Sequence, residues 1–158
     1  MKNHLIKVHD TAHRCRRLRV PETILKGMKP PVWHRLKVAS DLDLPQLHII
    51  LQAAMGWELE HLHSFEAWNP AARQYIHQSL LSRYNVDMEG EEGVAEYDVQ
   101  IGHVLHSVGD KLMYWYDFGD DWRPEIVLEK LEPWVADSPL AMCVGGRKTC
   151  PPEDCGGP

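Results

Sequence analysis

The chain has 158 residues, of which 44% are hydrophobic and 25% are charged, a composition that is typical of a folded globular protein and excludes wholesale disorder. Its formal net charge of −6 excludes a uniformly basic nucleic-acid coat protein. The charge is uneven, because residues 1–40 carry ten Lys and Arg against two Asp and Glu, whereas residues 41–158 carry seven against twenty-one. A local basic surface near the amino terminus is therefore compatible with the sequence.

The amino-terminal residues contain no apolar stretch of signal-peptide length, and no apolar run reaches the roughly 18 residues that span a bilayer. We therefore expect a cytoplasmic protein without a membrane partner, whose oligomeric state the sequence leaves open. Residues 1–13 are polar and rich in histidine, and we expect a flexible leader there. Residues 14–158 have the length of a single domain.

Residues 15–39 predict a basic β-hairpin. Its first segment contains Pro21, and a proline inside a strand favours an edge strand or a bulge. A turn signal at residues 27–31 follows, and residues 32–39 then alternate between apolar and polar side chains. The hairpin could contact nucleic-acid phosphates, or its positive charge could pair with the acidic remainder of the chain. The candidate contacts with nucleic acid are Arg17, Arg19, Arg35, Lys37 and Trp33, the last as a stacking surface.

Residues 44–55 have the clearest helical pattern in the chain. Asp43 and Gln46 have the spacing of a capping box, and Pro45 is tolerated in the first helical turn. Apolar residues recur at helical spacing up to Gly56, which suits a left-handed cap. We therefore expect a helix over about 44–55.

The next segments are less regular. Residues 57–68 predict a strand, residues 71–81 a short helix, and residues 85–93 an acidic exposed loop. A short helical turn suits residues 101–105.

The last predicted element is a hairpin over residues 111–131, whose turn is Gly119-Asp-Asp, and the chain from Pro133 onward has a loop-like composition. Because strands and helices do not alternate strictly, a doubly wound parallel sheet is disfavoured. We predict an α+β fold with a mainly antiparallel sheet of about five strands and the helix over about 44–55 packed on one face. The element order is β-grasp-like by analogy only.

His61 and His63 lie two residues apart in a predicted strand, so their imidazoles face the same side, about 7 Å apart at Cα. Such a pair can chelate zinc through neutral ring nitrogens, or it can be a half-buried polar pair bonded to backbone.

Asp117, Asp120 and Asp121 bracket the predicted hairpin turn. Carboxylates in this position could bind magnesium or another hard cation, or they could serve ordinary turn chemistry. Glu153 and Asp154 could join them in one acidic pocket.

Cys143, Cys150 and Cys155 form the third group of candidate metal ligands. Only the last two approach the spacing of a zinc knuckle. The two interpretations are a three-cysteine zinc site completed by His61 or His63, and free thiols in a surface turn.

Four stretches of the sequence resemble one known family. They are Lys29–Arg35, Leu47-His48 with Met55–Phe65, Tyr116–Trp122, and Cys150–Gly157. Together they are similar to the plasmid pRiA4b ORF-3-like family, also described as "TnpR" passenger proteins of the insertion element IS1096, over roughly residues 15–158. The resemblance implies a compact α+β domain associated with mobile elements, without an established activity. Members of that family usually continue with a helical tail after the Gly-Gly pair, so a truncated domain is one expectation.

Two functions follow from these patterns. The first is a non-enzymatic accessory or interaction domain of a mobile element, which contacts nucleic acid or protein through the basic hairpin. The second is a metal-dependent hydrolase, a phosphodiesterase or nuclease, that uses the His61/His63 and Asp117/Asp120/Asp121 groups. The serines of the chain lie in no recognisable nucleophile motif, so the sequence does not predict a serine recombinase.

Overall fold

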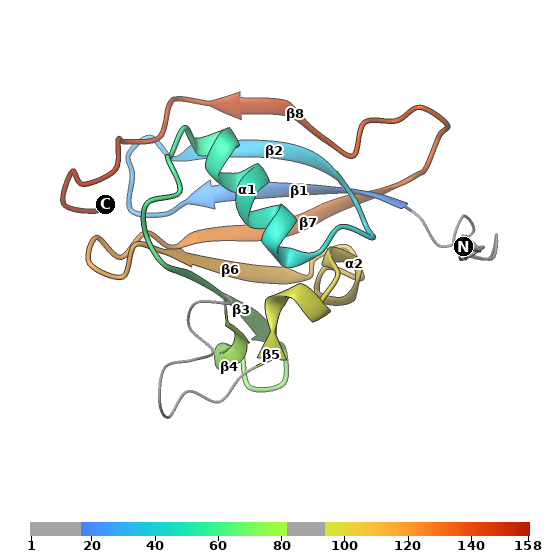
Figure 1. Ribbon diagram of the computed structural model, residues 1–158, viewed down its shortest axis with the longest axis horizontal. Helices are drawn as coiled ribbons and strands as arrows, with labels where there is room; N and C mark the ends of the chain where they lie inside the picture. Colours follow the sequence, from blue (N-terminus) through green and yellow to red (C-terminus); the bar gives the residue numbers. More distant parts are fainter. Residues whose placement is uncertain (1–16, 82–93) are drawn as a thin grey trace, which may run out of the picture.

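A computed structural model describes the backbone of residues 17–81 and 94–158, and the side chains of residues 21–75 and 96–158. Figure 1 shows a strongly curved sheet accompanied by a few short helices. The predicted leader over residues 1–13 and the predicted loop over residues 85–93 lie outside the described residues.

The sheet has eight strands within the described part of the chain, in the order β5-β4-β3-β6-β7-β1-β2-β8. Their bounds are β1 Arg17–Leu25, β2 Val32–Ala39, β3 His63–Asn69, β4 Gln74–Leu81, β5 Val94–Ala95, β6 Lys111–Tyr116, β7 Pro124–Pro133 and β8 Ala141–Arg147. Seven of them are joined by antiparallel pairing, and the two-residue β5 adds to the edge in parallel with β4. The result is a curled half-barrel.

The predicted architecture of about five strands with a helix packed on one face is therefore wrong: the fold is dominated by strands, and only 16% of it is helical. One reason is β4, which forms where a short helix was expected. Its residues are good helix formers, but pairing with β3 places Tyr75 opposite Trp68, with ring centroids 4.9 Å apart. Tertiary pairing overrides local propensity at this edge.

The second reason is β8, which forms where a loop was expected. Gly145 and Gly146 weaken the strand signal, and Gly146 is needed for the close packing of β8 on β2. A Cβ at Gly145 would lie 3.6 Å from the Trp33 ring, and a Cβ at Gly146 would lie only 3.0 Å from the ring of His34. The distance at Gly145 is that of ordinary packing, so Gly146 is the glycine that lets β8 approach a side chain of β2 closely.

The hairpin at the amino-terminal end of the domain is confirmed, and Pro21 is accommodated by a bulge. The register between β1 and β7 shifts between Val20 and Pro21, so the missing N–H falls at an irregularity of the ladder. The strand itself is not an edge, because β1 lies between β7 and β2.

The predicted helix is confirmed as α1, Leu44–Met55. Both bonds of the capping box are present, at 2.9 Å from the Gln46 amide to Asp43 Oδ1 and 3.0 Å from the Asp43 amide to Gln46 Oε1. The helix ends at Gly56, whose φ of 76° is left-handed. Two shorter elements follow β5, the 3₁₀ turn η1 (Glu96–Asp98) and the helix α2 (Ile101–Val104). None of the described helices has the length and apolar character needed to cross a membrane.

The core lies inside the curl of the sheet and contains α1. Leu44, Leu47 and Leu51 of the helix are fully buried, as are the aromatic residues Tyr114 and Trp122. Each fully buried leucine contributes roughly 1.5–3 kcal/mol to folding. This core fixes β6 and the turn after it, which carry the acidic motif.

Candidate metal centre

His61, Asp117 and Asp154 meet at one point of the surface. One ligand atom from each lies within 4.8 Å of the other two. His61 Nε2 is 3.2 Å from Asp154 Oδ1 and 3.6 Å from Asp117 Oδ2. The Nε2 atom is itself buried, and it has no partner with hydrogen-bond geometry. A buried ring nitrogen thus faces two carboxylates without a hydrogen bond.

Asp117 divides its two carboxylate oxygens between the turn and the cluster. It follows the last residue of β6 and has a left-handed φ of 52°, which is unusual for a residue with a Cβ. Its Oδ1 accepts hydrogen bonds from the amides of Gly119 and Asp120, at 3.1 and 3.3 Å. Because Oδ1 serves the turn, Oδ2 is the oxygen that faces His61. One oxygen of Asp117 therefore serves the chemistry of the turn, and the other lies in the cluster with His61 and Asp154.

His61 lies just before β3, in the loop that follows α1. Its amide donates to Tyr116 Oη at 3.4 Å, and its ring packs edge-on against the Tyr116 ring, with centroids 5.8 Å apart. The loop is held to the helix by the amide of Leu59, which donates to Gln52 Oε1 at 3.0 Å. Leu59 has a left-handed φ of 66°. Packing against Tyr116 and the tie to α1 thus fix the position of the imidazole.

Asp154 comes from residues 148–158, which we call the C-terminal segment. Glu153 anchors it, because Glu153 Oε1 accepts hydrogen bonds from Tyr116 Oη and from the amide of Glu58, the latter at 3.1 Å. Asp154 is much more exposed than its two partners, with 67% of its side chain accessible. The cluster is therefore open to solvent on the side of the C-terminal segment.

The other two aspartates of the turn have different partners. Asp120 Oδ2 accepts a hydrogen bond from the amide of Gly156 at 3.0 Å, and Asp121 Oδ1 accepts one from Arg123 Nε at 2.7 Å. Of the three predicted turn ligands, only Asp117 joins the cluster in the described part of the chain. Asp120 instead helps to hold the C-terminal segment.

His63 does not belong to the cluster of His61, Asp117 and Asp154. Its Nε2 lies 3.0 and 3.2 Å from the two carboxylate oxygens of Glu96, and both residues are buried. Its ring stacks on that of His48, with centroids 3.6 Å apart. The two histidines of the predicted chelating pair thus have separate partners.

A buried polar network around His48 was missed by the sequence reasoning. Gln52 Nε2 donates to Tyr114 Oη at 2.8 Å, so the Tyr114 hydroxyl proton points to His48 Nδ1, 2.7 Å away. Burial and the neighbouring His63 lower the pKa of His48 to about 3. The available signal was the pair of polar side chains four residues apart in the apolar stripe of the helix.

The cysteines do not assemble into a site among the described residues, because the only group of three or more metal-ligating side chains found there contains none of them. Cys143 and Cys155 are exposed. Cys150 is buried in the core, and burial raises the pKa of its thiol to about 11.

Two cations that the sequence singled out in the basic hairpin, Arg35 and Lys37, are paired with acidic side chains of the sheet. Arg35 binds Glu129 through two hydrogen bonds of 2.5 and 3.0 Å, and its guanidinium lies 5.0 Å from the centre of the Trp33 ring. Lys37 pairs with Glu132 at 2.5 Å. The interpretation in which the hairpin balances acidic neighbours therefore holds for these two residues, while the side chains of Arg17 and Arg19 lie outside the described set.

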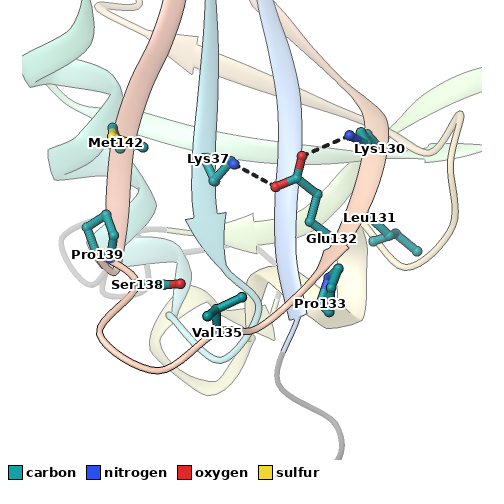
Figure 2. A pocket seen from close by; sticks show the side chains of 9 residues that line it. All are labelled: Lys37, Lys130, Leu131, Glu132, Pro133, Val135, Ser138, Pro139 and Met142. Atoms are coloured by element: carbon teal, nitrogen blue, oxygen red, sulfur yellow. Dashed lines mark hydrogen bonds and ion pairs between the residues drawn. The ribbon is translucent and has the colours of Figure 1, made fainter.

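A cavity of about 410 Å³ lies on the same part of the sheet, away from the cluster. Figure 2 shows its lining residues, which are Lys37, Lys130, Leu131, Glu132, Pro133, Val135, Ser138, Pro139 and Met142. Both lysines pair with Glu132, at 2.5 Å from Lys37 and 3.0 Å from Lys130. Both lysines thus share a single carboxylate, and the charged side chains that line this cavity carry one net positive charge.

Comparison with known proteins identifies the family. The sequence model of the plasmid pRiA4b ORF-3-like protein family matches residues 8–158. The chain belongs to this family. The resemblance predicted from its motifs is thereby confirmed, and the family name makes an origin in a plasmid or mobile element plausible. His61, Asp117 and Asp154 each come from a different one of the stretches that carry that resemblance.

The chain is also similar to two individual proteins without an assigned function. The chain is 33% identical over 140 residues to "Uncharacterized protein y4hQ" of Sinorhizobium fredii (strain NBRC 101917 / NGR234), an alignment that covers 85% of the chain and 64% of that protein. The chain therefore spans less than two thirds of the length of this curated relative. Its fold is similar to the crystal structure of the protein of unknown function MM3350 from Methanosarcina mazei Go1, with a TM-score of 0.77 and 28% identity, over 90% of this chain and 76% of that one.

Proposed function

We propose that this domain is a metal-dependent hydrolase with one divalent cation, held by His61, Asp117 and Asp154. The observation that carries the proposal is the buried Nε2 of His61, which faces two carboxylates and makes no hydrogen bond. A neutral imidazole nitrogen and carboxylate oxygens are together the donor set of zinc and similar transition-metal ions.

The charge of the cluster supports a cation at this place. Asp117 and Asp154 are held close together, and Glu153 and Asp120 lie beside them. Like charges at such distances repel each other unless a positive charge lies between them. That charge could be a metal ion or the protonated ring of His61, and these two possibilities make different predictions in the experiment below.

Three protein ligands leave coordination positions open, which is typical of catalytic rather than structural metal sites. A bound ion of this kind lowers the pKa of a coordinated water and acts as a Lewis acid on the substrate. The exposed side of Asp154 gives a substrate access to the cluster. Within hydrolases we propose the phosphodiesterase class, because a cation can offset the repulsion between the acidic cluster and a phosphate group.

The alternative accessory role through the basic hairpin has less support. Arg35 and Lys37 are paired with Glu129 and Glu132, so their charges are compensated inside the sheet. An accessory function in a mobile element is compatible with the family, but these contacts do not favour nucleic acid as its partner.

The test is calorimetric titration of chelator-treated protein with Zn²⁺ and Mn²⁺, combined with hydrolysis of bis(p-nitrophenyl) phosphate. We expect the His61→Gln and Asp117→Asn variants to lose affinity by roughly 10- to 100-fold or more, together with metal-dependent hydrolysis. Asp121→Asn is the matched control, because it removes a carboxylate of the same turn that pairs with Arg123 instead.

Two outcomes would overturn the proposal. If the wild type binds neither ion, the metal centre is wrong and the cluster is an ion pair of His61 with the aspartates. If the ions bind equally well to the His61→Gln variant, they bind elsewhere. Metal binding without hydrolysis would retain the metal centre and exclude the phosphodiesterase class.

A further inference from the structure

We propose that the cation also closes the end of the C-terminal segment over the site, which makes residues 151–158, beyond the buried Cys150, a metal-dependent lid. This inference rests on the proposed metal centre and adds a form of regulation to it. It follows from how the segment is attached, which charge it carries into the cluster, and how closely it approaches the hairpin turn.

The segment is attached by a few contacts to loops and side chains rather than by strand pairing. Residues 148–158 contain no helix or strand. The Pro151 carbonyl accepts a hydrogen bond from Trp57 Nε1 at 3.0 Å, and the Gly156 amide donates to Asp120 Oδ2 at 3.0 Å. In Figure 1 the carboxyl terminus lies beside the loop between β6 and β7, in agreement with this contact. Beyond Cys150, which is buried in the core, attachment of this kind can open without disturbing the sheet.

The segment nevertheless fits its position closely. Gly157 has a φ of 83°, and a Cβ at this position would lie only 2.3 Å from the carbonyl oxygen of Asp120. A side chain there is incompatible with the closed position. The glycine therefore allows the close approach that brings Asp154 to the cluster.

Charge decides whether closure is favourable. The segment brings Glu153 and Asp154 against Asp117 and Asp120, so in the absence of a cation closure adds negative charge to negative charge. A cation bound to His61 and Asp117 reverses the sign of this interaction, because Asp154 then supplies a ligand. Binding and closure are consequently linked: the ion favours the closed segment, and the closed segment increases affinity for the ion.

Hydrogen–deuterium exchange of the full-length chain, with and without Zn²⁺, tests the lid. In the wild type we expect saturating Zn²⁺ to slow exchange in residues 151–158 roughly tenfold, with little change in β6 and β7. In Asp154→Asn we expect the zinc-dependent slowing to be lost. The metal-free segment of this variant should exchange more slowly than that of the wild type, because the repulsion is reduced.

The opposite change is expected for Gly157→Ala. The C-terminal segment of this variant should exchange quickly in the absence of the ion. The affinity for Zn²⁺ should fall by the same factor as the population of molecules with a closed segment. Asp121→Asn again serves as the control, because its carboxylate pairs with Arg123 rather than with the segment.

The results separate the two proposals. If Zn²⁺ binds through His61 and Asp117 but exchange of the segment is the same with and without it, the lid is wrong and the metal centre stands. The lid is also wrong if Asp154→Asn retains the zinc-dependent slowing. If Zn²⁺ does not bind at all, the metal centre is wrong and the lid falls with it.

Discussion

Tyr116 donates a hydrogen bond to Glu153, and these two residues immediately precede Asp117 and Asp154 in the chain. The bond therefore joins the end of β6 to the C-terminal segment. In both places the next residue along the chain supplies a carboxylate to the cluster. The desolvated site of Tyr116 and the adjacent Glu153 raise the pKa of the phenol well above its ordinary value, so the hydroxyl is a donor throughout the physiological range. The two carboxylates are thus positioned by their neighbours.

Replacing Tyr116 with Phe should weaken metal binding at the proposed centre, although none of the three ligands is replaced. The variant loses the bond to Glu153, and we expect the free energy of unfolding to fall by about 1.5–3 kcal/mol, the range for hydrogen bonds to charged groups. Affinity for Zn²⁺ should fall roughly tenfold, as for other residues that orient ligands. Urea denaturation and calorimetric titration measure the two effects.

Tyr75→Phe is the matched control for this variant. Tyr75 also donates to a carboxylate, Glu125 Oε1 at 2.6 Å, but its strand lies on the far side of β3 from β6. The Tyr75→Phe variant should have a lower free energy of unfolding than the wild type but the same affinity for Zn²⁺. Equal loss of affinity in both variants would show that Tyr116 acts only through global stability.

Thiol labelling distinguishes the two interpretations of the cysteines. Because Cys143 and Cys155 are exposed, iodoacetamide should alkylate both in the native protein. Cys150 is buried and its thiol has a pKa of about 11, so it should react only after unfolding. Mass spectrometry of the labelled peptides gives the result. Protection of all three by Zn²⁺, reversed by a chelator, would instead support the three-cysteine zinc site.

The helix could be predicted from sequence because its signals are local. Asp43 and Gln46 complete the capping box within the first turn, and Gly56 ends the helix. The strand β4 could not be predicted in this way, because its stability depends on contacts such as Tyr75 with Trp68 across the sheet. Where a strand is stabilised by its neighbours, local propensity is a weak guide.

The site was predictable residue by residue but not as a set. The motifs singled out His61, Asp117 and Asp154 as candidates, but three segments far apart in the chain bring them together. Which turn aspartate faces His61 depends on the left-handed backbone of Asp117, for which the sequence offers no specific signal. His63 followed the same pattern as His61, yet a carboxylate from η1 engages it.

Affinity for nucleic acid should depend on the acidic partners of the hairpin more than on its cations. Arg35 and Glu129 form a neutral pair, so the double variant Arg35→Gln/Glu129→Gln, which removes both charges, should elute from a heparin or DNA column at the same salt concentration as the wild type. Glu129→Gln removes the compensating charge and should delay elution. Earlier elution of the double variant than of the wild type would show that the paired guanidinium still contacts phosphate.

Stability in mild acid should depend on His48. Its pKa falls from 6.5 to about 3 on folding, because burial and His63 disfavour the charged ring. The folded state therefore binds this proton less readily than the unfolded state, and the stability that this provides is complete above pH 6.5 and lost as the pH falls toward 3. The contribution of His48 to the free energy of unfolding changes by no more than about 1.4 kcal/mol per pH unit. Solvent screening of the half-buried ring makes the change smaller than this limit.

The interval from pH 6.5 to 4.5 isolates the effect, since Glu125, Glu129 and Glu132 have pKa values lowered from 4.5 and lose their contributions only below it. Urea denaturation across this interval should show a flatter pH dependence for His48→Gln, whose amide oxygen can still accept the Tyr114 proton. His34→Gln is the control, because burial also lowers the pKa of His34 and its smaller contribution should be separate and additive. A slope for His48→Gln equal to that of the wild type would show that the buried network does not govern the acid sensitivity of the fold.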